Sequence, residues 1–268
     1  LDSFGDLEIL PPFRNGDQNF PLGRILHGSV ESRHSDVALR AFLEAQGVQG
    51  PPLYVDTSWL EVGHVDEFVS FMPADTPRGW KLLLASPRLA REILQEYVGR
   101  DPANGRRLMF QGKYFYNQTT MRLVAAQRTV DAILADATLM AFNQRIQANI
   151  TTEFEKIREA AGLTDDEVVE IPFLFQNMGS GESAAYMPGT INLLFYGRTA
   201  VVAAPHGPFS DEVDLFEQDM TARLQPFGVT ARFAEQWDIL HAAEGEVHCG
   251  TNAVRQFPTR TRWWEVAR

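Results

Sequence analysis

Residues 55–73 read VDTSWLEVGHVDEFVSFMP, an apolar run that is typical of a β-strand but carries His64, Asp66 and Glu67 near its centre. Burying an ionisable group is costly unless the group is paired or used chemically. On a strand, alternate side chains point the same way, so His64 and Asp66 would share one face. The stretch therefore predicts that an imidazole and a carboxylate are presented together.

The alternative interpretation of His64 is a histidine that is satisfied by a hydrogen bond in the core. Two carboxylates and an imidazole within four residues would fill a core poorly, which favours a chemical role. A histidine exchanges protons near neutral pH, and a neighbouring carboxylate can hold a cationic substrate. His64 and Asp66 are therefore candidate site residues.

The apolar runs around this stretch predict an α/β protein. EFVSFMP (67–73) and GWKLLLAS (79–86) are joined by a turn, and Ser86 with Pro87 begins a helix that runs to about Tyr97. The same order of hairpin, helix and strand recurs over INLLFYG (191–197), TAVVAAP (199–205), DEVDLFEQDMTARL (211–224) and VTARFAE (229–235). Repeated units of hairpin and helix are one explanation of this recurrence.

Three further elements are expected. A helix over 36–46 begins after Ser35, and a strand follows at 53–57. A long helical tract spans 119–161, with a break near Asn149.

The chain is acidic and of moderate size. It has 268 residues, 44% of them hydrophobic, and 24 Lys and Arg against 35 Asp and Glu give a net charge of -11. One domain with one core is expected. The charge argues against a nucleic-acid partner and fits either a cationic partner or solubility alone. Because the sequence contains no long apolar run, we expect no membrane partner and a soluble protein, either cytoplasmic or secreted.

The second suggestive stretch is AEGEVHCGTNAVRQF at 243–257, which holds the single cysteine of the chain, Cys249. Gly250 leaves room for a ligand beside the backbone, and Thr251 and Asn252 supply polar groups. This setting suits a reactive thiol, and a buried cysteine in a turn is the alternative. One cysteine excludes a disulfide within the chain. A role as nucleophile requires that Cys249 and His64 meet in space.

Both stretches resemble the catalytic domain of the peptidylarginine deiminases. The resemblance rests on GHVDEF (63–68) and GEVHCGTN (245–252), and it extends in the family's order over LDSFGDLE (1–8), PLGRIL (21–26), LLLASPR (82–88) and MPGTINLL (187–194). It implies an α/β fold, the pseudo-fivefold α/β propeller (pentein fold) of the guanidino-modifying enzymes. It also implies a hydrolase that converts protein arginine to citrulline with release of ammonia.

The resemblance implies a role for each matching residue. Cys249 would be the nucleophile that forms a covalent thiouronium, and His64 would be the general acid and then the base. Asp66 would grip the guanidinium, and Val62 would contact the substrate. The chemistry agrees with these roles, because a delocalised guanidinium is a poor electrophile and carboxylates must hold its plane against the thiolate.

Calcium is the activator that the resemblance implies. The carbonyls of Phe4 and Leu7 and the carboxylate of Glu8 match ligands of the family, and a hard cation held by oxygens is chemically reasonable. A turn with one exposed glutamate is the alternative.

The resemblance also predicts that residues 1–268 are the C-terminal portion of one deiminase catalytic domain that lacks its N-terminal portion. The family's second guanidinium carboxylate and its peptide-holding arginines lie upstream, and Ala243 stands where the family has another arginine. The expected partners are an arginine-containing protein or peptide and the upstream segment, which is either missing or on a companion chain.

Other functions stay open at this point. The same fold could act on free arginine or another small guanidino compound, or the chain could be an inactive fragment or binding module. A cysteine protease built on Cys249 and His64 would need an oxyanion hole and would cleave amides. A metal site of His64, Asp66, Glu67 and His248 is a further alternative.

Overall fold

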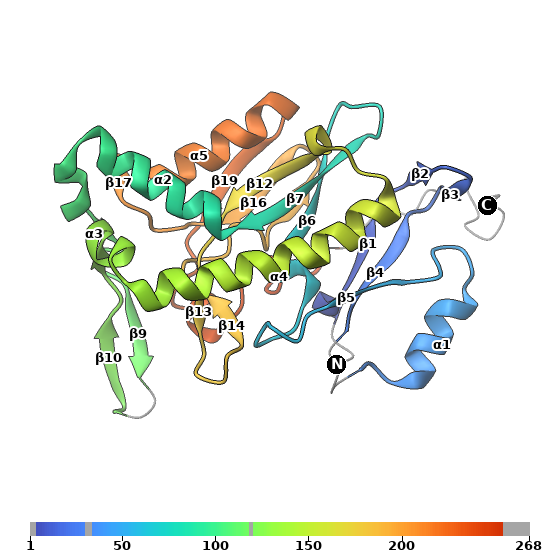
Figure 1. The fold of residues 1–268 in the computed structure, drawn as a ribbon, viewed down its shortest axis with the longest axis horizontal. Coiled ribbons are helices and arrows are strands. Elements are labelled where there is room, and N and C mark those ends of the chain that lie inside the picture. The colour runs from blue at the N-terminus through green and yellow to red at the C-terminus, as the bar shows by residue number, and fades with distance from the viewer. Residues whose placement is uncertain (1–3, 30–33, 118–119, 254–268) are drawn as a thin grey trace.

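This mixed α/β protein contains three small three-stranded sheets that share one topology (Figure 1). The computed structural model describes residues 4–29, 34–117 and 120–253, so residues 1–3 and 254–257 of the stretches quoted above lie outside it. Each sheet contains an antiparallel hairpin. The second strand of the hairpin also pairs in parallel with a third strand, which the chain reaches through one or more helices. The chain thus forms three ββαβ units in succession.

The first unit consists of β1 (Leu7–Leu10), β4 (Arg24–Ser29), α1 (Val37–Ala45) and β5 (Leu53–Asp56). The second consists of β6 (Val69–Pro73), β7 (Trp80–Ser86), α2 (Pro87–Arg100), α3 (Val130–Leu134), α4 (Ala137–Ala161) and β12 (Val168–Pro172). The third consists of β15 (Leu194–Tyr196), β16 (Thr199–Ala203), α5 (Leu215–Leu224) and β19 (Thr230–Ala234).

Short elements complete the described chain. The two-stranded pairs are β2 (Phe13–Asn15) with β3 (Gln18–Phe20), β8 (Leu108–Met109) with β11 (Arg128–Thr129), β9 (Tyr114–Asn117) with β10 (Arg122–Ala125), β13 (Phe175–Asn177) with β14 (Ser183–Ala185), and β17 (Phe209–Ser210) with β18 (Val213–Asp214). The 3₁₀ turns are η1 (Phe4–Asp6), η2 (Val65–Glu67), η3 (Pro102–Arg106), η4 (Asp165–Glu167), η5 (Gln225–Phe227) and η6 (His241–Ala243).

Both hairpins expected from the apolar runs are confirmed, since β6 pairs with β7 and β15 pairs with β16. The helix after the first hairpin begins as predicted, because Ser86 Oγ accepts the N–H of Leu89 (3.1 Å) and Pro87 occupies the first turn. The helix near residue 36 begins one residue later than expected. Its cap is Asp36, whose Oδ1 accepts the N–H of Ala38 (2.7 Å).

The helix break expected near Asn149 is wrong. Helix α4 is continuous from its cap at Asp136 to Gly162, which has a φ of 62° and ends the helix. Ile146 and Ile150 are buried on either side of Asn149, so packing of the apolar face maintains the helix there. The helical tract also begins later than expected, since β10 and β11 precede α3. Within the described residues no helix, α4 included, is long and apolar enough to cross a membrane.

The strand expected across residues 64–66 is also wrong, because the chain forms the 3₁₀ turn η2 there. The Glu67 carboxylate accepts the backbone N–H of His64 (2.8 Å), which closes the turn. Gly63 precedes it with a φ of 83°, a conformation that favours glycine. Strand β6 begins only after this turn, so alternation along a strand does not orient the imidazole and the carboxylate.

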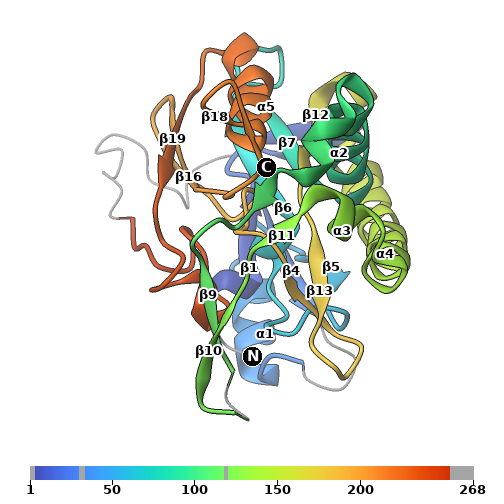
Figure 2. The same cartoon turned by 90° about the vertical axis from the view of Figure 1, so that its left-hand side faces the viewer.

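The core is densest around β7, all of whose residues are buried. This strand lies between β6 and β12, and a strand buried on both faces is expected to be an apolar run. Helix α4 contacts β7, and α2 contacts β12. Figure 2 shows α2 and α4 on one side of the molecule and β16 and β19 on the other.

A buried asparagine ties the longest helix to β13. Asn143 Nδ2 donates to the carbonyls of Leu139 (2.9 Å) and Phe175 (2.8 Å), and its Oδ1 accepts the N–H of Phe175 (2.9 Å). Leaving buried backbone groups unsatisfied costs about 1–3 kcal/mol each, so this residue stabilises the fold.

Candidate active site

The two chemically suggestive stretches occupy equivalent places in the repeated units. Residues 57–67, with Asp66, follow β5, which is the last strand of the first unit. Residues 235–250, with Cys249, follow β19, which is the last strand of the third unit. The two stretches therefore occupy the same connection of the repeated unit.

Asp66 is where the two stretches meet. The residue is 3% exposed, and its Oδ2 accepts a hydrogen bond from Nδ1 of His248 (2.7 Å) across 182 residues of sequence. The same oxygen lies 3.9 Å from Sγ of Cys249. Its Oδ1 is buried with no hydrogen-bond partner in the part of the chain that the structure describes. A buried carboxylate with an open acceptor is suited to a cationic partner.

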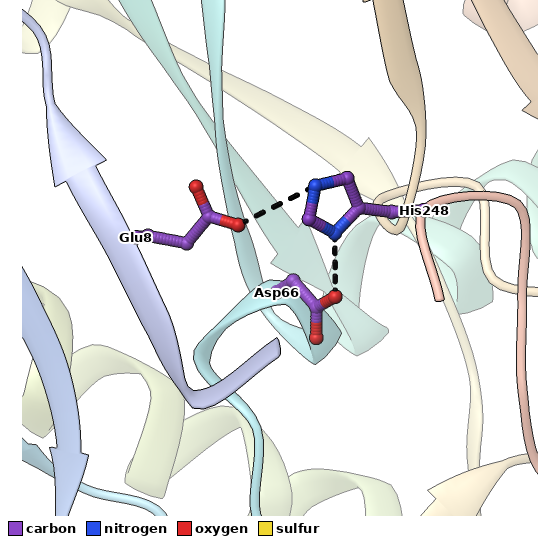
Figure 3. A group of neighbouring side chains, drawn as sticks. All are labelled: Glu8, Asp66 and His248. Carbon is purple, nitrogen blue, oxygen red and sulfur yellow. Dashed lines mark hydrogen bonds and ion pairs between the residues drawn. The ribbon is translucent and has the colours of Figure 1, made fainter. Parts of the chain in front are cut away.

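The His248 imidazole lies between two carboxylates (Figure 3). Its Nε2 is 3.6 Å from Oε1 of Glu8, and its Nδ1 contacts Asp66. The ligand atoms of these three residues lie within 4.8 Å of one another, close enough to hold a metal ion. Of the residues considered for a metal site from the sequence, Asp66 and His248 belong to this group, and Glu8 takes the place of His64 and Glu67.

The predicted calcium ligands flank the start of β1. Phe4 begins η1, and Leu7 and Glu8 begin the strand. Leu7 and Glu8 line the same cavity as Asp66. Carbonyl and carboxylate oxygens are ligands that calcium takes, so the chemistry of these donors fits that ion.

His64 immediately precedes η2, is buried and is 9% exposed. Its Nδ1 has no hydrogen-bond partner among the described residues. The backbone of Gly5 passes so close that a Cβ at this position would lie 2.4 Å from Nδ1. Desolvation lowers the pKa of His64, and the negative charge of Asp66 opposes that effect. Asp66 thus acts electrostatically on His64 as well as on Cys249.

Cys249 lies in a turn and is exposed, so the alternative of a buried cysteine is wrong. Desolvation and the negative charge of Asp66 raise the pKa of its thiol to about 11. A cation bound between the thiol and Asp66 would lower this pKa.

Glu67 has a structural role in the turn, and it also lines the small pocket that reaches Cys249. Its carboxylate accepts the N–H of His64 (2.8 Å), and desolvation raises its pKa, which the backbone hydrogen bonds of His64 and Gly63 oppose. Val62 lies half-buried in the bend that precedes Gly63. Its contact with a substrate stays a prediction.

Sequence reasoning missed Asn192. Its Oδ1 accepts the backbone N–H groups of His248 (3.0 Å) and Cys249 (3.2 Å), and its Nδ2 donates to the backbone carbonyl of Asp66 (3.4 Å). The one available signal was a polar residue inside the apolar run INLLFYG, just before the strand β15.

Two cavities adjoin these residues. The larger has a volume of about 800 Å³. Its lining includes the carboxylates of Glu8 and Asp66, the aromatic side chains of Phe71 and Trp80, and the side chains of His248 and Asn192. A small pocket of about 20 Å³ is lined by Cys249, Glu67, Glu246 and Asn192, among others. Asn192 therefore lies between the cavity that reaches the acid and the pocket that reaches the thiol.

The ββαβ units bring Cys249, the buried carboxylate of Asp66 and His248 together. This arrangement defines an α/β protein with a cysteine-based candidate site. A family model described as "Protein-arginine deiminase (PAD)" matches residues 1–265. The chain therefore belongs to the protein-arginine deiminase family, as the GHVDEF and GEVHCGTN stretches predicted.

Named relatives agree with this assignment. The chain is 36% identical over 272 residues to human protein-arginine deiminase type-4 and 34% identical over 270 residues to human type-3, with 99% of the chain and 39% of each relative covered. It is 36% identical over 269 residues to mouse type-1, with 98% and 38% covered. The chain thus spans about two fifths of the length of these relatives.

A solved agmatine deiminase from C. jejuni, with substrate bound, gives a TM-score of 0.40 at 9% identity. The similarity covers 89% of this chain and 53% of that one, and at this level it carries no structural argument.

The close approach of Gly5 to His64 yields a prediction. We expect Gly5→Ala to displace the imidazole, because the added Cβ would lie 2.4 Å from Nδ1. A misplacement of about 1 Å can cost an enzyme on the order of 10²-fold in rate, so this variant tests the role that the resemblance implies for His64. Turnover of an arginine peptide by the intact protein measures the loss. The control is Gly99→Ala, where a Cβ meets nothing within 4 Å, and equal rates for both variants would contradict the prediction.

Proposed function

We propose that the protein containing this chain hydrolyses the guanidinium group of arginine side chains in proteins, giving citrulline and ammonia. The observation that carries the proposal is the meeting of Cys249 Sγ with the buried carboxylate of Asp66 at 3.9 Å. A thiol beside an acid with one open oxygen suits a planar cation that must be held while it is attacked.

In the proposed first half-reaction, Asp66 binds the guanidinium and the Cys249 thiolate attacks its central carbon. His64, as imidazolium, gives a proton to one nitrogen while the bond from carbon to that nitrogen breaks. Ammonia leaves, and a thiouronium remains on Cys249. The positive charge of the bound guanidinium offsets the negative field of Asp66, which lowers the pKa of the thiol from its raised value.

In the proposed second half-reaction, neutral His64 takes a proton from water, and the resulting hydroxide attacks the thiouronium carbon. The bond from carbon to sulfur then breaks, the thiolate leaves with its electron pair, and the proton of the added hydroxyl passes to solvent. The product carries a ureido group in place of the guanidinium. Burial lowers the pKa of His64 and so favours the neutral form that this step needs, whereas the negative charge of Asp66 opposes that effect and favours the imidazolium of the first half-reaction.

We propose that the three ββαβ units belong to a five-unit propeller, with further units and the second guanidinium carboxylate supplied by a segment outside this chain. The repetition of one design in the three three-stranded sheets supports this arrangement. In such a propeller, equivalent connections converge on the axis, which agrees with the matching positions of the two site stretches.

We propose calcium as the ion held by the carbonyls of Phe4 and Leu7 and the carboxylate of Glu8. When bound, the ion would supply positive charge beside Glu8 and Asp66 and would help to order these side chains. We expect Glu8→Gln to weaken calcium binding by about tenfold or more, measured by calorimetry on the intact protein. Glu159→Gln, on an exposed helical position, is the matched control; unchanged affinity for Glu8→Gln would remove this residue from the ligand set.

The roles of the two central residues predict a distinct pattern of damage. We expect Cys249→Ser and His64→Ala each to lower citrulline formation by about 10³-fold or more, with folding retained. Ammonia and citrulline are measured with a blocked arginine peptide and with free arginine.

The comparison of the blocked arginine peptide with free arginine separates the alternative functions. Preference for free arginine would favour a small guanidino substrate, and cleavage of the peptide chain would favour a protease. Full activity of Cys249→Ser would contradict the mechanism, and inactivity of the wild-type protein would favour a binding module.

A further inference from the structure

We propose that Asn192 is a positioning residue for the reaction, which holds the backbone of Cys249 against Asp66; this inference rests on the proposed role of Cys249 as nucleophile. Neither of the two site stretches contains this asparagine. It lies in the connection that leads into β15, between the stretches in sequence and between their side chains in space.

The side chain of Asn192 holds the backbone of the proposed nucleophile. Two successive N–H groups, of His248 (3.0 Å) and Cys249 (3.2 Å), converge on the single Oδ1 of Asn192. The backbone carbonyl of Asn192 also accepts the N–H of His248 (3.2 Å). Because both N–H groups point at one buried oxygen, the turn that carries the thiol has little freedom to rotate.

The same amide also holds the backbone of the acid. The Nδ2 of Asn192 donates to the backbone carbonyl of Asp66 at 3.4 Å. One side chain therefore connects the backbones of the nucleophile and of the guanidinium-binding acid. The Sγ to Oδ2 separation of 3.9 Å is set between these two anchored points.

Asn192 is itself well anchored. It is 2% exposed, and the apolar neighbours Ile191 and Leu193 are buried on either side. The hydroxyl of Thr190, also fully buried, donates to the carbonyl of Pro172 (3.0 Å) at the end of β12. The segment is thus fixed to the sheet of the second unit, so the amide is a rigid reference point for both loops.

The chemistry of the position favours asparagine. Its amide has an acceptor for the two N–H groups and a donor for the carbonyl. Aspartate would supply the acceptor without the donor, and alanine would supply neither. The amide also acts on the thiol: desolvation and Asp66 raise the pKa of Cys249, and the hydrogen bond of Asn192 lowers it. Loss of the amide should therefore make the thiolate rarer as well as misplace it.

The test compares three variants in the intact protein: Asn192→Ala, Asn192→Asp and the control Asn143→Ala. Asn143 is another buried asparagine with hydrogen bonds to backbone groups, but it joins α4 to β13. The main readout is the rate at which iodoacetamide alkylates Cys249 from pH 6 to 10, quantified by mass spectrometry of the peptide that contains it. Thermal unfolding, kcat and KM are measured in parallel.

For Asn192→Ala we expect alkylation at neutral pH to fall about tenfold, equivalent to about one pKa unit, and kcat to fall on the order of 10²-fold with KM changed little. For Asn192→Asp, which keeps the acceptor but adds a negative charge, we expect the alkylation profile to move to higher pH. Asn143→Ala should lower thermal stability and leave the profile unchanged.

The proposal is overturned if the alkylation profiles of both Asn192 variants superimpose on that of the wild type. It is equally overturned if Asn143→Ala shifts the profile as much as they do, because the effect would then be general destabilisation. If Asn192→Ala fails to fold, Asn192→Asp carries the test alone. Alkylation does not depend on turnover, so a wild-type protein that releases no ammonia would refute deimination while this comparison stayed readable.

Discussion

The buried carboxylate of Asp66 is the constraint on which the site depends. A carboxylate in a residue that is 3% exposed has lost most of its hydration and must be stabilised by donors or cations. His248 donates to one oxygen, and the other oxygen has no partner among the described residues. The acid therefore favours a cationic partner, and desolvation together with the charge of Asp66 raises the pKa of the neighbouring Cys249 thiol.

The fold brings these groups together by repetition. In the first and third ββαβ units, the segment after the last strand carries one of the site stretches, and the connection into β15 carries Asn192. Elements distant in sequence thus meet through short turns rather than through strands. Gly5 from the start of the chain packs against the His64 ring, and Glu8 from β1 contacts His248, so the first unit contributes to both ends of the group.

Sequence reasoning predicted what depends on local pattern. The hairpins follow from apolar runs and turns, the start of α2 follows from Ser86 and Pro87, and the two motifs identified the family. It failed where particular hydrogen bonds override composition. The hydrogen bond from the His64 N–H to Glu67 follows Gly63, whose φ is positive. Together they form a turn where the apolar sequence predicted a strand. The role of Asn192 consists of contacts to residues far along the chain, which no local pattern reveals.

The most direct measurement is a crystal structure of the intact protein with Cys249→Ser and a blocked arginine peptide bound. We expect the guanidinium to pair with Asp66 in place of His248, with its central carbon about 3–3.5 Å from the side-chain oxygen of residue 249. A guanidinium bound away from this acid, with Asp66 still held by His248 alone, would contradict the account.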